Sequence, residues 1–367
     1  MKIPPLVNPP QQAKLSSIQA LRGIAAILVA YAHSIDLQEN YSHSLQQSFF
    51  HWEDFGAFGV DLFFIISGFI ICYSADKYTG IPAGGRFLVH RFRRINPTYY
   101  AATLPLLLLR VYHWKIQHEP SAFIPCSELI KTLTLLPFGD HKYWVNTLLP
   151  IAWTLSFEWL FYLIFFVTIV TRVKQKQILL WIITATLVIT GYIHGPWKDF
   201  RLSFLTNPIF LEFILGSILY QCYRKIPLAR GYAWLLLGTG IAFCLGEIII
   251  GYGDISDKNK TINGSLSAER VLLWGIPAAC IVAGSLFLEK KGVPAFVRPK
   301  RWILLLGNAS YSIYLTQELT YLALKRLYAA TGFFLPADLA VVLQLLLATL
   351  VGILFYAKIE RSLLRLI

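Results

Sequence analysis

Charged residues are scarce in this chain of 367 residues. Asp, Glu, Lys and Arg together make up 14%, against the roughly one quarter that is usual in soluble globular proteins, and apolar residues reach 56%. This shortage of charge excludes an ordinary soluble enzyme and indicates that lipid surrounds much of the chain. With aromatic residues at 15%, the composition also excludes a disordered chain, a collagen and a long coiled coil.

Cysteine is also rare, and its placement predicts neither disulfides nor a metal site. The five cysteines mostly fall in apolar runs, where a free thiol behaves as a small hydrophobic group. They are Cys72, Cys126, Cys222, Cys244 and Cys280. No bound metal or permanent cofactor is therefore expected.

Long apolar runs, in contrast, recur along the whole sequence. A bilayer core of about 30 Å needs roughly 20 apolar residues per helix, because backbone polar groups in hydrocarbon must be satisfied within the segment. We therefore predict an all-α integral membrane protein with about ten transmembrane helices. The predicted spans are 18–36, 58–75, 97–112, 149–171, 178–194, 202–221, 231–251, 270–288, 302–322 and 338–357.

The basic residues outside these spans predict the orientation. If the N-terminus is cytoplasmic, the inner segments carry 21 Lys and Arg residues and the outer ones carry 9, as the positive-inside rule requires. Both termini are then cytoplasmic. The domain prediction is a cytoplasmic segment at 1–17, which shows no cleavage pattern, followed by one membrane domain at 18–367. Insertion and anionic lipid account for the net charge of +13, so nucleic acid is not an expected partner.

Ionisable side chains at membrane depth are candidates for function, because a charge in the bilayer costs several kcal/mol. His33 lies 11 residues after Arg22, close to three helical turns, so both side chains project from nearly the same helix face about 16 Å apart. This spacing predicts two sites at different depths of one cavity. The imidazole of His33 changes protonation near neutral pH and suits a general base, whereas the guanidinium of Arg22 stays charged and suits an anion. Asp36 either orients the His33 ring or simply satisfies a core histidine.

Two further acids reach a similar depth. Asp61 opens the second span in GVDLFFIISGF, and Glu158 lies mid-span in WTLSFEWLFY, a segment that begins at Trp153. Both helices descend from the outside, so these carboxylates can converge on the level of His33. The alternatives are pairing with Arg110 or Arg270, and hydrogen bonds to hydroxyls such as that of Ser67.

The densest basic cluster is GGRFLVHRFRRINP, which ends at Pro97. Its arginines favour bidentate recognition of phosphate, although anchoring at the inner face alone would produce the same pattern. Arg91 and Arg94 share a face if the segment is helical, and Pro97 is expected at a bend or a helix start. The cluster contains Arg86, Arg91, Arg93 and Arg94.

Several strings together resemble the membrane acyltransferase-3 family, which acylates sugars of bacterial surface and secreted polysaccharides. IQALRGIAAILVAYAH is similar to the opening signature, with Arg22 and His33 at the family's Arg and His positions. FGVDLFFIISGFII, RFRRINPTYY and WTLSFEWLFY resemble its next signatures, and LGNASYSIYL and IERSL resemble weaker C-terminal ones. Where relatives often have Trp-His and Pro after YSIYL, this chain has Thr316, Gln317 and Leu319.

The resemblance implies a ten-helix enzyme of the bacterial cytoplasmic (inner) membrane that takes an acyl group, most often acetyl, from cytoplasmic acyl-CoA. The acceptor would be a hydroxyl of a polysaccharide or a lipid-linked oligosaccharide on the far side. No esterase-like domain is fused, so transfer would finish within the membrane core. The aromatic loop at 113–148, with Trp114, Phe123, Tyr143 and Trp144, would stack on sugars or only mark the membrane interface.

The resulting hypothesis assigns a role to each candidate residue. Arg91, Arg94 and Arg86, with Arg22 deeper, bind the donor's phosphates, and His33 acts as general base or forms an acyl-histidine. Asp36 or Glu158 orients the His33 ring, while Asp61, Ser67 and Trp153 contact the acceptor or shape the site. The alternatives are a proton-coupled transporter of a small anion or lipid-linked sugar, and a scaffold in an export complex.

Overall fold

The computed structural model describes residues 15–39, 54–136, 147–195, 197–251, 253–332 and 335–366. These residues form helices joined by short connections, with no strand among them. Residues 1–14 of the predicted N-terminal segment, and Tyr143 and Trp144 of the predicted aromatic loop, lie outside the described residues. The longer helices are α1 (Ser16–Glu39), α2 (Phe58–Ala75), α3 (Ile81–Lys115), α5 (Trp153–Val170), α6 (Lys176–His194), α8 (Phe210–Lys225), α9 (Arg230–Ile250), α12 (Ile276–Lys290), α14 (Arg301–Thr331) and α15 (Ala337–Phe355).

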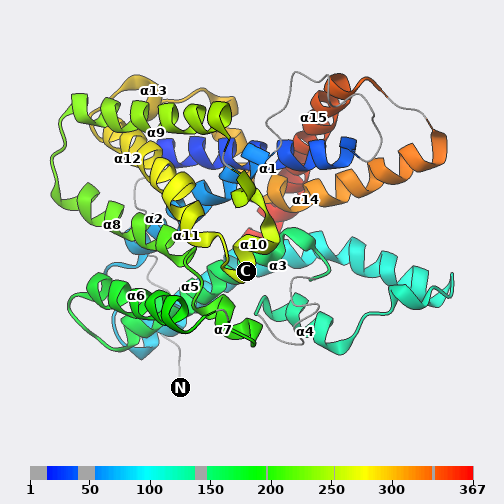
Figure 1. Ribbon diagram of the computed structural model, residues 1–367, viewed down its shortest axis with the longest axis horizontal. Helices are drawn as coiled ribbons and strands as arrows, with labels where there is room; N and C mark the ends of the chain where they lie inside the picture. Colours follow the sequence, from blue (N-terminus) through cyan, green and yellow to red (C-terminus); the bar gives the residue numbers. More distant parts are fainter. Residues whose placement is uncertain are drawn as a thin grey trace.

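Short helices connect the long ones or cap their ends (Figure 1). A 3-10 turn, η4, precedes α5, and a π-helical turn, η7, follows α15. The short elements are η2 (Asp54–Ala57), η3 (Pro120–Ala122), α4 (Cys126–Thr134), η4 (Pro150–Ala152), α7 (Phe200–Leu205), η5 (Gly253–Ser256), α10 (Lys258–Asn263), α11 (Ser267–Arg270), η6 (Val271–Gly275), α13 (Pro294–Val297), η7 (Tyr356–Glu360) and α16 (Arg361–Leu366).

The all-α membrane class is confirmed, and eight helical segments of the described chain are long and apolar enough to cross a bilayer. Ten spans were predicted. The other two predicted spans, 97–112 and 302–322, lie within α3 and α14, which are long enough but not apolar enough. These two helices carry polar residues that face internal cavities, which explains their lower hydropathy.

The structure corrects two local predictions. The predicted span 202–221 is interrupted between α7 and α8, where Pro208 lacks an N–H and the Asn207 side chain binds the carbonyls of Thr261 and Ile262 at 2.8 and 3.0 Å. Pro97 does not mark a helix start, because α3 already begins at Ile81 and continues through it. The arginine cluster is therefore helical.

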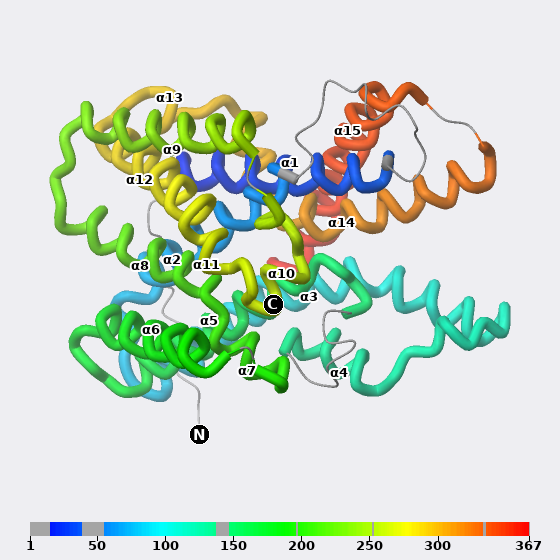
Figure 2. Tube along the Cα trace, viewed as in Figure 1, coloured from blue at the N-terminus to red at the C-terminus, as the bar shows by residue number. Residues whose placement is uncertain are grey.

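The central layer is built by α1, which packs against α14, α2 and α15 (Figure 2). Close contact between α1 and α14 requires small residues: a Cβ placed on Gly307 would lie 1.9 Å from the carbonyl oxygen of Gln19. A Cβ on Gly68 of α2 would similarly lie 2.1 Å from the Phe213 oxygen of α8. These contacts fix Arg22 and Ser67 on opposite sides of the space that becomes the site.

Candidate active site

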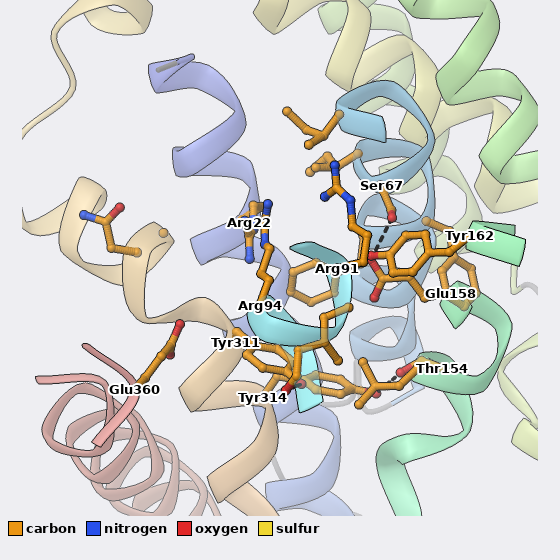
Figure 3. Close-up of a pocket in the computed structure, with 18 of the residues that line it drawn as sticks. Arg22, Ser67, Arg91, Arg94, Thr154, Glu158, Tyr162, Tyr311, Tyr314 and Glu360 are labelled. Atoms are coloured by element: carbon orange, nitrogen blue, oxygen red, sulfur yellow. Dashed lines mark hydrogen bonds between the residues drawn. The ribbon is translucent and has the colours of Figure 1, made fainter. Parts of the chain in front are cut away.

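A cavity of about 570 Å³ opens between α1, α2, α3, α5 and α14, beside the C-terminal segment. This volume lies within the range of small-molecule sites. Its lining includes four arginines and two glutamates, so the cavity carries a surplus of positive charge. Figure 3 shows the labelled guanidinium groups of Arg22, Arg91 and Arg94 with Glu158 and Glu360 at its edges.

Three arginines come from two elements. Arg22 projects from α1, and Arg91 and Arg94 lie one turn apart on α3, as the R-x-x-R spacing predicts for a helix. None of the three forms an ion pair with an acid of the described residues. Guanidinium groups gathered without paired acids are suited to a polyanionic ligand such as a phosphate ester.

Arg91 is the most deeply buried arginine of this group, with 3% of its surface exposed. Its Nη2 donates to Ser74 Oγ at 2.6 Å, and the rings of Phe87 and Tyr162 flank it at 5.3 and 5.6 Å. Its Nε has no hydrogen-bond partner in the part of the chain that the structure describes. Burial lowers the pKa of Arg91 below its usual value, although a guanidinium keeps its charge at neutral pH.

His90 also lines the cavity and was missed by sequence reasoning. Burial and the neighbouring charges of Arg91, Arg94 and Arg93 lower the pKa of this imidazole from 6.5. It is therefore largely neutral at physiological pH. In the sequence, the only indication of this role was that His90 directly precedes Arg91, the first arginine of the R-x-x-R motif.

Glu158 brings a carboxylate to the same cavity from α5. Its Oε1 accepts hydrogen bonds from Ser67 Oγ at 2.8 Å and from the Tyr162 hydroxyl. It lies close enough to Arg22 and Arg91 for the charges to interact. The hydrogen bond to Ser67 was the alternative considered for Glu158, and it joins two of the predicted site residues.

The C-terminal half of the chain contributes residues that sequence reasoning did not assign. Glu360 lines the cavity and accepts a hydrogen bond from Ser312 Oγ at 2.5 Å. Tyr311 donates to the Ile95 carbonyl at 3.0 Å, and Tyr314 to the Ile151 carbonyl at 2.9 Å. Their strings, IERSL and LGNASYSIYL, were the signal, but neither indicated a role for an individual residue.

His33 is placed differently from the arginines. Its Nδ1 lies 3.0 Å from Asp36 Oδ2, which confirms the expected contact. The ring, with about a third of its side chain exposed, is not among the residues that line the cavity. The cavity thus reaches Arg22 and ends before His33, whereas one passage bordering both was expected.

The remaining predicted residues take structural positions. Asp61 is fully buried and pairs with Arg270 through two hydrogen bonds of 2.9 and 2.7 Å, so it is unavailable to an acceptor. Trp153 is 7% exposed and packs edge-on against Phe64 at 6.4 Å. Arg86 is exposed on α3 and does not line the cavity, because it lies five residues before Arg91 and so faces away from it.

Comparison with known proteins identifies the family. A family model described as "Acyltransferase domain" matches residues 15–357, nearly the whole chain. The chain belongs to the acyltransferase-3 family. It is thus a multi-pass membrane acyltransferase, as the sequence motifs predicted. No solved structure matches the chain.

Two curated relatives extend this assignment. The chain is 29% identical over 334 residues to "Exopolysaccharide production protein ExoZ" of Rhizobium meliloti (strain 1021), an alignment that covers 88% of this chain and 94% of that protein. It is 24% identical over 299 residues to "Putative peptidoglycan O-acetyltransferase YrhL" of Bacillus subtilis (strain 168). The second alignment covers 72% of this chain and 44% of that protein. Both printed names concern bacterial glycans.

Proposed function

We propose that this acyltransferase moves an acyl group, acetyl in the first instance, from cytoplasmic acyl-CoA to a hydroxyl of an exopolysaccharide or another surface glycan. The observation that carries the proposal is the cavity of about 570 Å³ with its unpaired arginines, which suits the phosphates of coenzyme A. The name of the Rhizobium meliloti relative supports the glycan acceptor. In this proposal ten helices span the bacterial inner membrane and both termini are cytoplasmic.

The donor binds through the arginines. Arg91 supplies a buried guanidinium whose Nε has no partner among the described residues, and Arg22 and Arg94 add charge to the same cavity. Charge-assisted hydrogen bonds to the phosphates would satisfy these groups. Glu158, held by Ser67 and Tyr162, offsets part of the positive charge and leaves room for the uncharged pantetheine arm.

The chemical step uses His33 as general base. An Nδ1–H that donates to Asp36 leaves the lone pair on Nε2, so the ring can accept the proton of the acceptor hydroxyl. The hydroxyl oxygen attacks the thioester carbonyl, the new C–O bond forms, and the C–S bond breaks. The departing sulfur of coenzyme A then takes the proton from Nε2. Asp36, rather than Glu158, orients the ring in this scheme.

The test combines donor-only incubation with analysis of the glycan. Purified protein should bind acetyl-CoA and hydrolyse it slowly, and mass spectrometry of the host's surface polysaccharide should show acyl groups that disappear when the protein is absent. His33→Ala should reduce transfer by about 10²- to 10⁴-fold while folding and acetyl-CoA binding persist. The exposed His194 provides a matched control, His194→Ala, which should keep full activity.

Each outcome has a defined meaning. A protein that ignores acetyl-CoA and leaves the glycan unmodified would be a transporter or a scaffold, and the proposal would fail. A fully active His33→Ala variant would remove the base assignment but keep the donor site.

A further inference from the structure

A second cavity, of about 390 Å³, lies farther along the helices that build the first. Residues of α3 and α14 line it, together with Pro150 of η4 and residues of the connection around η3. In Figure 1 the C-terminal ends of α3 and α14 extend together to the right, away from most of the other helices. This second cavity contains no residue of the first.

The order of residues shows that the two cavities follow one another along the helices. On α3 the lining passes from Arg94 in the first cavity to Arg110 in the second, and on α14 from Tyr311 to Arg326. At 1.5 Å per residue these steps correspond to about 24 and 22 Å. On α5 and η4 the order is reversed, as expected for a helix that runs in the opposite direction. All three elements therefore place the second cavity beyond the first.

A thin layer of side chains separates the two cavities. Thr154 and Tyr314 line the first, whereas Pro150 and Glu318, each four residues away along the chain, line the second. The Tyr314 hydroxyl lies 2.8 Å from Thr154 Oγ1, and the Phe63 ring meets the Tyr314 ring edge-on at 5.9 Å. Figure 3 shows the Tyr314–Thr154 contact on the side of the cavity away from Arg22.

The charge of the second cavity differs from that of the first. Arg110 and Arg326 are balanced by Glu119 and Glu318, so there is no surplus for a phosphate. Arg326 Nη2 lies 3.0 Å from His113 Nε2, and Arg110 Nη1 donates to Glu128 at 2.6 Å. Glu318 accepts no hydrogen bond from any described residue and is only half-buried. Donors and acceptors in equal measure suit an uncharged polyol.

The stretch of α14 that lines the second cavity packs beside the part of α1 that carries the proposed base. Tyr321, three residues after Glu318, donates from its hydroxyl to the carbonyl of Ala30, three residues before His33, at 2.6 Å. Glu318 also contributes to the electrostatics of the His33 ring. A hydroxyl held by Glu318 would therefore lie near His33, while the donor's phosphates remain with the arginines of the first cavity.

We propose that the second cavity binds the acceptor sugar, with Glu318 and Arg326 holding its hydroxyls, and that Tyr314 and Thr154 form the partition through which the thioester must pass. This proposal rests on the proposed function. The chemistry of the transfer step is unchanged, and the new content is where the acceptor binds and what separates it from the donor.

The acceptor assignment is tested with polysaccharide from the host, stripped of acyl groups by mild alkali. Glu318→Gln and Arg326→Gln should raise the KM for this polysaccharide by at least about tenfold, the loss expected for one charge-assisted hydrogen bond. The Kd for acetyl-CoA, measured by calorimetry, should change far less, because the first cavity shares no lining residue with the second. The matched control is Lys325→Gln, an exposed neighbour on α14 outside the cavity. The lipid-linked precursor, assayed in parallel, distinguishes which form of the sugar is accepted.

An unchanged polysaccharide KM in both variants would overturn the acceptor site. Equal loss of transfer and of acetyl-CoA binding would mean that these residues support the fold, which would also overturn it. A wild-type protein that neither binds nor hydrolyses acetyl-CoA is a different result, because the proposed function itself would then fail.

The partition has its own test. Tyr314→Ala should open the layer to water from the second cavity and raise acetyl-CoA hydrolysis several-fold in the absence of polysaccharide. Tyr314→Phe keeps the ring against Phe63 and should raise it much less. Equal hydrolysis in wild type, Tyr314→Ala and Tyr314→Phe would show that Tyr314 does not separate the cavities. Thermal unfolding of each variant checks that the fold is intact.

Discussion

Two buried arginines of this protein have opposite surroundings. Arg270 is 1% exposed and fully bonded: Asp61 neutralises it, the carbonyls of Ala57 and Ile255 each accept a hydrogen bond at 3.0 Å, and Trp274 covers its guanidinium at 4.7 Å. Arg91 is 3% exposed, but within the described part of the chain it has one hydrogen bond, from Nη2 to Ser74, and no partner for Nε.

The difference teaches how to tell a structural charge from a binding charge. A buried charge is costly unless it is paired and hydrogen-bonded. Arg270 meets that condition within the protein, so it joins α2 to α11 and leaves nothing for a ligand. Arg91 does not meet this condition, and it lies beside Arg22 and Arg94 at a cavity. An anionic ligand would supply the counter-charge and the hydrogen-bond acceptors that Arg91 lacks.

Breaking the satisfied pair should have the largest effect. Asp61→Asn removes the carboxylate that pairs with Arg270, and the loss expected for half of a buried ion pair is about 3–5 kcal/mol of unfolding free energy. Thermal unfolding in detergent measures it. The control is Asp199→Asn, which breaks the exposed pair with Arg201 and should cost less than about 1 kcal/mol.

A double variant sharpens this prediction. Asp61→Leu combined with Arg270→Met removes both charges and should recover much of the lost stability, because a paired substitution leaves no buried charge. If Asp61→Asn alone unfolds at the wild-type temperature, the pair does not hold the fold, and the distinction between the two arginines fails.

Removing the unsatisfied arginine should instead affect binding. Arg91→Gln eliminates a buried charge that has no acid partner among the described residues, so stability should change little. Acetyl-CoA affinity should fall about 10- to 100-fold, the value of one or two hydrogen bonds between charged groups. Titration calorimetry with acetyl-CoA and thermal unfolding, on the same preparation, separate the two effects.

The exposed Arg230 at the start of α9 gives the matched control, since Arg230→Gln removes the same charge far from the cavity. Unchanged acetyl-CoA affinity in Arg91→Gln would reduce this arginine to an anchor for membrane topology. If Arg91→Gln destabilised the protein as much as Asp61→Asn, Arg91 would be a structural charge like Arg270.

The sequence predicts the features that local patterns determine. Apolar runs at membrane length are local, so each of the ten predicted spans overlaps a helix, and the R-x-x-R spacing correctly predicts a shared face for Arg91 and Arg94. The signature strings also predict the family. Each of these signals lies within a few helical turns of chain.

Other features depend on contacts between distant residues and could not be predicted. Asp61 and Arg270 are 209 residues apart, and nothing in either neighbourhood selects this pairing over Arg110. The phase of Arg22 and His33 on α1 predicted a common cavity. The cavity ends instead where Tyr314, from a helix nearly 300 residues later, meets Thr154. Side chains that close a passage come from elements whose packing the local pattern does not encode.

The smallest effect concerns His90, whose pKa lies below 6.5 because of burial and the neighbouring arginines. As the pH falls from about 7.5 to about 5.5, this imidazole starts to gain a proton and adds positive charge to the donor cavity. Relative to a variant without this imidazole, acetyl-CoA affinity should therefore rise two- to threefold over this range, by roughly half a kcal/mol, as for an exposed charge pair. Calorimetry across the range measures it.

His90→Gln is the matching variant, because glutamine keeps a polar side chain that does not titrate. Its acetyl-CoA affinity should match the wild-type value near pH 7.5, where His90 is already neutral, and should fall below it as the pH is lowered, partly because the donor's own phosphate gains a proton at about pH 6. A rise that persists in His90→Gln would assign the pH dependence to another group of the cavity. A fall in wild-type affinity relative to His90→Gln at low pH would mean that the cavity does not bind the donor's phosphates, since the added charge on His90 favours an anion there.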